Sequence, residues 1–532
     1  MCCLKRQMKA NMNQIYDTIV IGTGIAGLTA AIHLKEAGQN VIVLTKNDKI
    51  SECNTNYAQG GIIAYRPDDS AEALEKDIFY AGCYYNNQQA VKTLANEGPK
   101  LVFDFLINKI GIQFSTNDAG QLDYTEEAAH SQRRILHYQD HTGDKIESSL
   151  IAYSQKIGIV ILPGHTAIDL ITNNHHSTDN QELYKPREVM GVYALNNATG
   201  DVITFFASNV ILATGGVGNL FQYTTNPASA TGDGISMAYR AGADIINAEF
   251  VQFHPTALFH KDLKRFLISE SLRGEGAKLL NHNGEQFMSK YSPLKELAPR
   301  DVVARAIYEE INTTGKEYVL LDLAHYYTGT KPIEERFYKI YHTCKEVGLD
   351  ITKDPIPVVP AAHFFCGGIK VDNNGRASIK NLYAVGEVSC TGLHGANRLA
   401  SDSLLEGMLW GKRAADDIIA TGTHIPNERF DKIPDWKQPA DSIEFDKLLI
   451  YQDWNAIKLT MWNYTGIVRT HTGLARASAD LNYYYHRIIK FYKEAKLNRD
   501  IIELRNGIVT AQIIVSAAIH NDKSLGCHFI KD

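Results

Sequence analysis

The chain has 532 residues, a net charge of −6 and 44% hydrophobic residues, as expected of a globular protein of about three domains. This acidic balance argues against a nucleic-acid-binding protein, which usually carries a basic surface. Eight cysteines without a CxxC pair indicate free thiols in a reducing compartment and no metal site. Residues 1–14 lack the apolar core of a secretory signal, and no apolar run approaches the ~18 residues of a membrane span. We therefore expect a cytoplasmic protein without membrane attachment.

The first elements form a strand, a glycine-rich turn and a helix. Residues 17–21 are a short β-branched run typical of a buried strand. Residues 28–37 have helical spacing and end at Gly38, a candidate helix cap. Residues 40–45 form a second apolar run. This order predicts a βαβ unit and hence a parallel, doubly wound α/β sheet.

The turn between the first strand and the helix is a GxGxxG motif: Gly22, Thr23, Gly24, Ile25, Ala26 and Gly27. Glycines let the backbone approach a pyrophosphate, and the helix N-terminus offers free N–H groups and partial positive charge. An ordinary glycine turn is the alternative, but the strand and helix on either side favour a dinucleotide site. An NAD site also expects an acidic residue after the second strand. Thr45 and Lys46 stand there instead, which argues against a simple NAD-dependent dehydrogenase.

Three later segments favour FAD. The first is a polar loop that ends in a glycine pair: Asn54, Thr55, Asn56, Tyr57, Ala58, Gln59, Gly60 and Gly61. Residues 213–216 and 381–387 resemble two further strand-end motifs of large FAD-binding folds. In those folds the acidic residue after the last glycine, here Glu387, meets the ribityl chain. A surface glutamate is the alternative for Glu387 taken alone.

The rest of the chain divides into further regions. Residues 173–188 are polar and predict an exposed hairpin loop or an insertion. Residues 421–441 are rich in proline and predict a linker. After the linker the pattern is helical. We expect residues 1–246 and 362–425 to form two parts of an FAD-binding domain, residues 247–361 an inserted capping domain, and residues 426–532 a helical domain.

Five motifs carry a resemblance to a known family. They occupy residues 249–256, 272–276, 298–301, 362–368 and 392–398. With them the chain, from residue 16 to its end, resembles the succinate dehydrogenase/fumarate reductase flavoprotein family. The resemblance implies a Rossmann-type FAD-binding domain, an inserted α+β capping domain and a C-terminal helical domain.

Two arginines and two histidines in these motifs fit a dicarboxylate. The planar fork of arginine matches a carboxylate in bidentate fashion, and Arg300 and Arg398 supply two such groups beside His254 and His363. Each of the four taken singly is also compatible with a surface position. The resemblance implies that Arg300 is the acid/base residue at the substrate Cβ. It implies that Arg398, His254 and His363 bind the carboxylates.

The resemblance also implies partners for Arg300 and for the cofactor. Glu270 and Arg273 resemble a proton-relay segment, which an arginine base needs because its own pKa exceeds about 12. Lys46, the loop of residues 54–61 and Asp233 would contact FAD. Ser403 and Leu404 would lie near the start of a helix directed at the pyrimidine edge of the flavin, where a positive dipole end stabilises negative charge.

Two features distinguish the branches of the family. Branches that bind FAD covalently carry a histidine where this chain has Asn54, so the resemblance implies non-covalent FAD. By the same resemblance, Glu127 would lie near a substrate amino group, because a carboxylate favours an ammonium group; a solvated acidic pair with Glu126 is the alternative. The chain departs from the family at Ala128 and Ala129, where two glycines are usual, and at Leu525, where an arginine is usual.

The resemblance therefore implies oxidation of L-aspartate to iminosuccinate (iminoaspartate). Molecular oxygen would be the acceptor and give hydrogen peroxide, with fumarate as the alternative acceptor. This would be the first step of de novo NAD biosynthesis and would feed quinolinate synthase. Two other functions remain open: a soluble fumarate reductase or succinate dehydrogenase flavoprotein subunit, and a flavin-binding protein without turnover. The complete set of arginines and histidines argues against the last.

Overall fold

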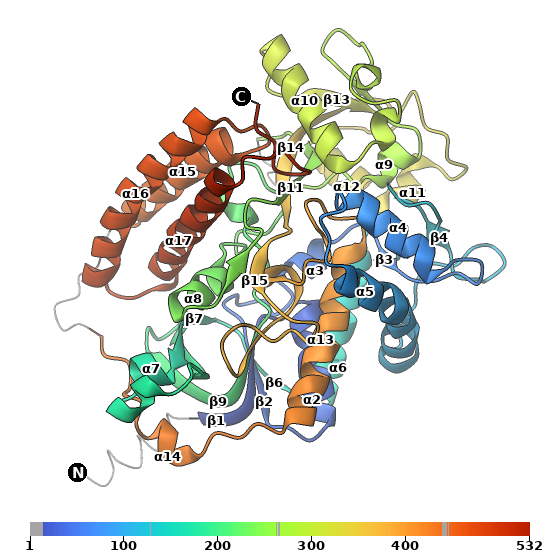
Figure 1. Ribbon diagram of the computed structural model, residues 1–532. Coiled ribbons are helices and arrows are strands. Elements are labelled where there is room, and N and C mark those ends of the chain that lie inside the picture. Colours follow the sequence, from blue (N-terminus) through green and yellow to red (C-terminus); the bar gives the residue numbers. More distant parts are fainter. Residues whose placement is uncertain are drawn as a thin grey trace.

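The computed structural model describes residues 14–127, 129–261, 263, 266–438, 444 and 446–531 (Figure 1). Residues 1–13, where a secretory signal would lie, are outside the described residues. So is Ala128, one of the two alanines where the family usually has glycine.

The predicted parallel sheet is confirmed. Its parallel strands run in the order β6-β2-β1-β9-β16. Their bounds are β1 (Gln14–Ile21), β2 (Val41–Leu44), β6 (Val160–Leu162), β9 (Val202–Leu212) and β16 (Leu382–Ala384). The strands that flank the predicted hairpin loop, β7 (His165–Thr172) and β8 (Val189–Asn196), extend the sheet in antiparallel fashion. Their place in this sheet was not predicted. β8 and β16 can both pair with β9 because β8 pairs with its first half and β16 with its last three residues.

Side-chain alternation along β1 gives the sheet two buried faces. Val20 joins a core that includes residues of α2 (Ile25–Glu36), α6 (Thr142–Lys156) and α13 (Asp402–Thr421). Ile19 and Ile21 join a second core with α8 (Asp233–Ala241) and α17 (Arg499–His520). Figure 1 shows α2 and α13 side by side on one side of the strands and α8 with the C-terminal helices on the other. Helices thus cover both faces of the parallel sheet.

Smaller elements complete this part of the molecule. The helical ones are α3 (Asn54–Tyr57), α4 (Ala71–Ala81), α5 (Gln88–Leu101) with its π-helical extension η1 (Val102–Ile110), α7 (Asn173–His176), η2 (Asn180–Tyr184), η3 (Gly218–Leu220) and η6 (Gly386–Val388). Two three-stranded sheets consist of β3 (Ile62–Ile63), β5 (Ile135–Leu136) and β4 (Tyr124–Thr125), and of β10 (Ile245–Ile246), β15 (Gly368–Lys370) and β17 (Ser389–Cys390). The loop predicted between residues 173 and 188 does connect two hairpin strands, but it holds α7 and η2 and buries Asn173.

The region predicted as an insertion has its own antiparallel sheet, in the order β11-β14-β13-β12. Its elements are β11 (Val251–Leu258), β12 (Lys278–Leu280), β13 (Val319–Asp322), β14 (Ile356–Phe365), α9 (Ser271–Gly274), α10 (Arg300–Thr314), α11 (Ile333–Arg336), α12 (Tyr338–Glu346), η4 (Met288–Lys290) and η5 (Lys295–Leu297). These elements surround a separate hydrophobic core. The domain borders drawn from the sequence stay a prediction.

The chain ends in three long helices, α15 (Lys447–Thr465), α16 (His471–Glu494) and α17. Against the sequence-based expectation, α17 is long and apolar enough to cross a membrane, but 78% of its apolar window is buried inside the protein. It is therefore a core helix, packed against α8, α15 and α16. The proline-rich linker is packed as well: α14 (Asn427–Phe430) stacks Phe430 on Phe206 of β9.

Candidate active site

One cavity joins the two groups of residues singled out in the sequence. The predicted cofactor-binding residues that line it are Gly22, Thr23, Gly24, Ile25, Ala26, Lys46, Asn54, Thr55, Tyr57, Ala58, Gln59, Gly60, Gly61, Asp233, Glu387, Ser403 and Leu404. The predicted substrate residues that line it are Glu127, His254, Glu270, Arg300, His363 and Arg398. Gly27, Asn56 and Arg273 are not among the lining residues. A cofactor bound at the glycine turn can therefore extend to the arginines without leaving the cavity.

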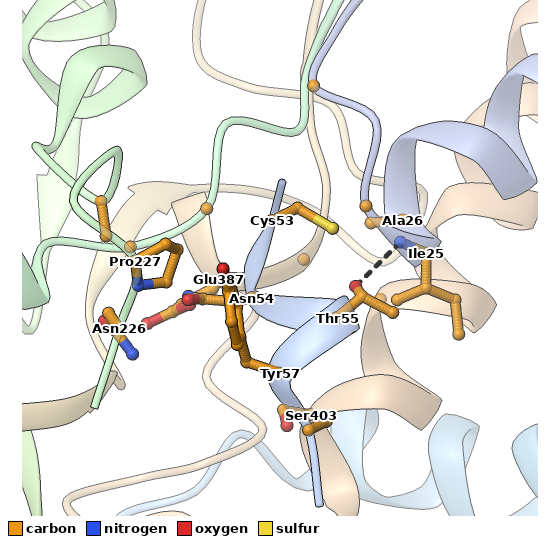
Figure 2. A pocket seen from close by; sticks show the side chains of 18 of the residues that line it. Ile25, Ala26, Cys53, Asn54, Thr55, Tyr57, Asn226, Pro227, Glu387 and Ser403 are labelled. Atoms are coloured by element: carbon orange, nitrogen blue, oxygen red, sulfur yellow. Dashed lines mark hydrogen bonds between the residues drawn. The ribbon is translucent and has the colours of Figure 1, made fainter. Parts of the chain in front are cut away.

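The glycine turn brings α2 directly against the strand ends. Gly22 has φ +120°, and a Cβ on it would lie 2.0 Å from the Ala213 carbonyl oxygen. Gly27 does not line the cavity because it faces the turn: a Cβ there would lie 2.2 Å from the Gly22 oxygen. At the start of α2 the Ile25 N–H donates to Thr55 Oγ1 at 3.1 Å (Figure 2). This helix start offers the amides and the dipole that a pyrophosphate needs.

Buried polar atoms in the cavity fit a large polar cofactor. Among the described residues, Gln59 Oε1, Thr214 Oγ1 and Asn226 Oδ1 are buried without a hydrogen-bond partner, and all three residues line the cavity. Because an unpaired buried polar atom costs free energy, such atoms point to a ligand that pairs with them. The dinucleotide of FAD, with its hydroxyl, amide and phosphate groups, fits this lining.

Glu387 lies on the cavity wall between two elements. Its carboxylate accepts hydrogen bonds from Asn54 Nδ2 at 2.8 Å and from the Phe365 N–H at 3.0 Å. Burial raises the pKa of Glu387 to about 7. Figure 2 shows Asn54 and Glu387 directed toward one another across the cavity from Ile25 and Ala26. The side-chain amide of Asn54 is thus hydrogen-bonded to a carboxylate.

Lys46 occupies the position after β2 where an NAD site would carry an acid. Its Nζ lies 2.6 Å from Asp233 Oδ2 and 2.8 Å from Glu503 Oε1. Asp233 Oδ1 accepts from Asn506 Nδ2 at 3.0 Å. Glu503 and Asn506 belong to α17, so the C-terminal helices reach the cofactor end of the cavity. No sequence pattern indicated this contact.

The start of α13 faces the same cavity. Ser403 and Leu404 lie in its first turn, as the sequence predicted. The N-cap residue Ser401 is in the left-handed region at φ +58°. This backbone turn directs the helix N-terminus at the cavity, where its partial positive charge favours a negative group.

At the substrate end, Arg300 begins α10 and is held by a buried carboxylate. Glu270 Oε2 accepts from Arg300 Nε at 2.8 Å, and Glu270 Oε1 accepts from Arg273 Nη2 at 2.8 Å. Arg273 lies behind Glu270, which explains why it does not line the cavity. Burial alone would raise the pKa of Glu270, but the two guanidinium groups hold it below its usual value. The three side chains form a continuous ion-paired cluster.

Arg398 and the two histidines converge from separate strands and loops. The His254 and His363 rings lie 5.1 Å apart, and Arg398 lies over the Phe364 ring at 4.5 Å. Burial lowers the pKa of His254 and His363 well below 6.5, with Arg300 and Arg398 adding to the effect, so both rings are neutral. The Thr256 N–H donates to His254 Nδ1 at 3.2 Å, and this leaves the Nε2–H of His254 as a donor.

Glu127 is buried against the polar loop of residues 54–61. Its Oε2 accepts from Ser401 Oγ at 2.7 Å, and a Cβ on Gly60 would lie 2.6 Å from its Oε1. Burial raises the pKa of Glu127, and the nearby Glu270 raises it further. The surface alternative for Glu127 is therefore wrong. Ala129 beside it has φ +66°, a left-handed conformation that glycine adopts without strain.

The sequence missed two residues of this cluster. Gln252 Oε1 accepts from Arg300 Nη1 at 3.2 Å. Side chains alternate along a strand, so residues 252 and 254 of β11 lie on one face. Gln252 could therefore have been predicted from its spacing to His254. Ser401 contacts Glu127 and also accepts from the Gly61 N–H at 3.2 Å. No sequence signal marked Ser401, because its role follows from the left-handed turn.

The comparisons with known proteins agree with this geometry. A family model described as "FAD binding domain" matches residues 17–404, and one described as "Fumarate reductase flavoprotein C-term" matches residues 454–532. The chain is 40% identical to an L-aspartate oxidase of Yersinia pestis, over 99% of this chain and 97% of that protein. It is 39% identical to a chloroplastic L-aspartate oxidase of Oryza sativa subsp. japonica, over 97% of this chain and 81% of that protein. A quinol fumarate reductase of E. coli has a similar structure, with a TM-score of 0.84, 28% identity, and 98% and 92% of the two chains covered.

Proposed function

The chain belongs to the family of L-aspartate oxidases and fumarate reductase flavoproteins, and from this we propose that it oxidises L-aspartate to iminosuccinate with FAD. The family and the fold are those of an FAD-dependent oxidoreductase. The observation that carries the choice of substrate is the buried Glu127 carboxylate beside a cluster of two arginines and two neutral histidines. A dicarboxylate that also bears an ammonium group can form ion pairs or hydrogen bonds with all of these side chains.

Each end of the substrate has its own partners in this proposal. Arg398 and the two histidines bind the carboxylates, because a guanidinium group and neutral N–H donors match carboxylate oxygens. Glu127 meets the ammonium group and repels a substrate with a third carboxylate. Ser401 keeps the Glu127 carboxylate turned toward the cavity.

Oxidation removes a hydride from Cα and a proton from the amine nitrogen, so that the C–N single bond becomes a C=N bond. FAD, when bound, accepts the hydride. Molecular oxygen then takes up the two electrons with two protons and gives hydrogen peroxide. With fumarate as acceptor, the two electrons and two protons give succinate, and Arg300 delivers the proton at Cβ through the relay with Glu270 and Arg273.

We further propose that FAD binds without a covalent bond. Among the described residues 53–61, which form the flavin loop, there is no histidine. Acid precipitation should release all of the yellow colour into the supernatant. Colour that stays with the pellet would contradict the proposal.

The first test is anaerobic. L-aspartate added to the purified yellow protein should bleach the oxidised flavin absorbance, whereas succinate should not. Bleaching by succinate alone would favour a fumarate reductase or succinate dehydrogenase subunit. No bleaching by either compound would favour a flavin-binding protein without turnover. We also propose that this reaction is the first step of NAD biosynthesis and that quinolinate synthase uses its product.

A further inference from the structure

The chain after α17 returns to the active site. We call residues 524–531 the C-terminal strap; Figure 1 shows it as the dark red segment beyond α17, beside β11 and β14. Within it, the Cys527 N–H donates to the Ala396 carbonyl oxygen at 2.9 Å, and the Gly526 carbonyl oxygen accepts from Arg305 Nη1 at 3.0 Å. Ala396 lies two residues before Arg398, and Arg305 lies on α10, which begins at Arg300. The strap therefore contacts both the loop that carries Arg398 and the helix that begins at Arg300.

The strap is also fixed at its other end. The Arg469 N–H donates to the Phe529 carbonyl oxygen and the Lys531 N–H to the Arg469 carbonyl oxygen, both at 2.9 Å. The buried Arg469 guanidinium donates to His528 Nδ1 at 2.5 Å and to the Glu249 carbonyl oxygen at 2.8 Å. Burial lowers the pKa of His528 to about 4, so the ring stays neutral and accepts. The strap is thus held between the C-terminal helices and the substrate cluster.

Asn397 connects the strap to Arg300. Its Oδ1 accepts from Cys527 Sγ at 3.3 Å and from Gln252 Nε2 at 2.7 Å. Gln252 in turn accepts from Arg300 Nη1 through its Oε1. Burial raises the pKa of the Cys527 thiol, so the sulfur keeps the proton that it donates. The orientation of the Gln252 amide, which must present oxygen to Arg300, is set by this chain of donors and acceptors.

The same amides position Arg398. Gln252 Nε2 also donates to the Arg398 carbonyl oxygen at 2.8 Å. Asn397 Nδ2 donates to Asp301 Oδ1 at 3.3 Å, and Asp301 is paired with Arg305 at 2.7 Å. A shift of the strap would therefore move the loop that carries Arg398 relative to the start of α10, which carries Arg300.

We propose that the C-terminal strap is a positioning element of the active site, which holds Arg300 and Arg398 at the spacing that a dicarboxylate requires. This inference depends on the proposed function only in naming L-aspartate as the substrate. It applies equally to fumarate, which has the same two carboxylates. Strap residues do not line the cavity, so they act through Asn397 and Gln252.

Gly526→Ala with Gly422→Ala as a matched control tests the proposal. Both glycines are left-handed, at φ +52° and +56°, so alanine strains both alike. A Cβ at Gly526 would lie 2.5 Å from the Ala396 carbonyl oxygen, whereas a Cβ at Gly422 would meet nothing within 4 Å. We expect Gly526→Ala to lower kcat/KM at least about tenfold for both L-aspartate oxidation and fumarate reduction, and Gly422→Ala to stay within about twofold of wild type. Equal kinetics in the two variants would overturn the proposal.

A second pair separates positioning from simple loss of stability. Cys527→Ser keeps a donor to Asn397, and Cys527→Ala removes it. We expect the serine variant to retain the wild-type kcat and KM and the alanine variant to raise KM and the dissociation constant of succinate, the latter followed by the perturbation of the flavin absorbance. If both variants lose activity in proportion to their melting temperatures, the strap is only structural and the proposal fails. A wild-type protein that reduces fumarate but leaves L-aspartate untouched would refute the proposed function alone.

Discussion

Glu127 is the residue on which the choice between L-aspartate and succinate depends. Glu127→Gln keeps the shape and the contact with Ser401 but removes the charge that attracts the ammonium group. We expect kcat/KM for L-aspartate to fall about tenfold to a hundredfold, because a charged hydrogen bond contributes roughly 1.5–3 kcal/mol. Fumarate reduction should change by less than about threefold. Steady-state kinetics with both substrates measure this, and equal losses would contradict the assigned role.

The pH dependence of L-aspartate oxidation tests the same carboxylate. The pKa of Glu127 is raised by burial and by Glu270, so it gains its proton at a higher pH than an ordinary carboxyl group. Only the anionic form attracts the ammonium group. As the pH falls, kcat/KM for L-aspartate should therefore begin to decline above 4.5, the ordinary value. The Glu127→Gln variant should lack this acid limb; a limb unchanged in the variant would assign it to another group.

Glu387 makes the stability of the apoprotein depend on pH. Its folded-state pKa is about 7 and its ordinary value is 4.5, so between these values the folded state binds more protons than the unfolded state. The free energy of unfolding should fall as the pH rises through this window. In the wild-type apoprotein we expect the free energy of unfolding to fall by on the order of 2 kcal/mol across this window, and in Glu387→Gln we expect this fall to be absent. The value is smaller than the full pKa shift implies, because solvent in the cavity screens the carboxyl group. Urea unfolding of both apoproteins at pH 5 and pH 7.5 measures the difference, and parallel pH profiles would contradict it.

Among the elements, the contact between α2 and α13 fixes the width of the cofactor site. A Cβ on Gly411 of α13 would lie 2.5 Å from the Ala26 carbonyl oxygen, in the glycine turn. In Gly411→Ala, the helix propensity of alanine contributes about 1 kcal/mol, but overpacking against backbone costs roughly 1–3 kcal/mol. We expect lower stability and weaker FAD binding.

Lys412→Ala is the control for this change, since Lys412 is on the solvent side of the same helix and makes only a surface ion pair with Asp416. Denaturant unfolding and FAD titration of both variants measure the effect. A Gly411→Ala protein that binds FAD as tightly as Lys412→Ala would show that the helices can separate without cost.

At the scale of the whole molecule, local patterns predicted more than distant pairings did. Strands β1, β2 and β16 and helices α2 and α13 were found because hydrophobic period, glycine turns and helix starts lie within a few residues of each other. The hairpin loop between β7 and β8 was predicted, but their pairing with β9 was missed, because nothing in their sequence says which edge of β9 stays free. In the site, the residues inside motifs were found, whereas Ser401 and Glu503 were missed because they act through contacts between segments distant in sequence.

The contact between Lys46 and α17 is such a pairing, and it joins the first βαβ unit to the last helix. Lys46 is 14% exposed at the side chain and serves two buried carboxylates, Asp233 and Glu503. In Lys46→Met the buried Asp233 would lose its cationic partner beside Glu503, which keeps Arg499 at 2.9 Å, and breaking a buried ion pair costs about 3–5 kcal/mol. We expect a loss of roughly that size in the free energy of unfolding. Adding Glu503→Gln should restore part of it, because the second change removes the negative charge next to the unpaired Asp233. Urea unfolding of the two single variants and the double variant completes the cycle. Additive losses would mean that α17 docks without help from Lys46.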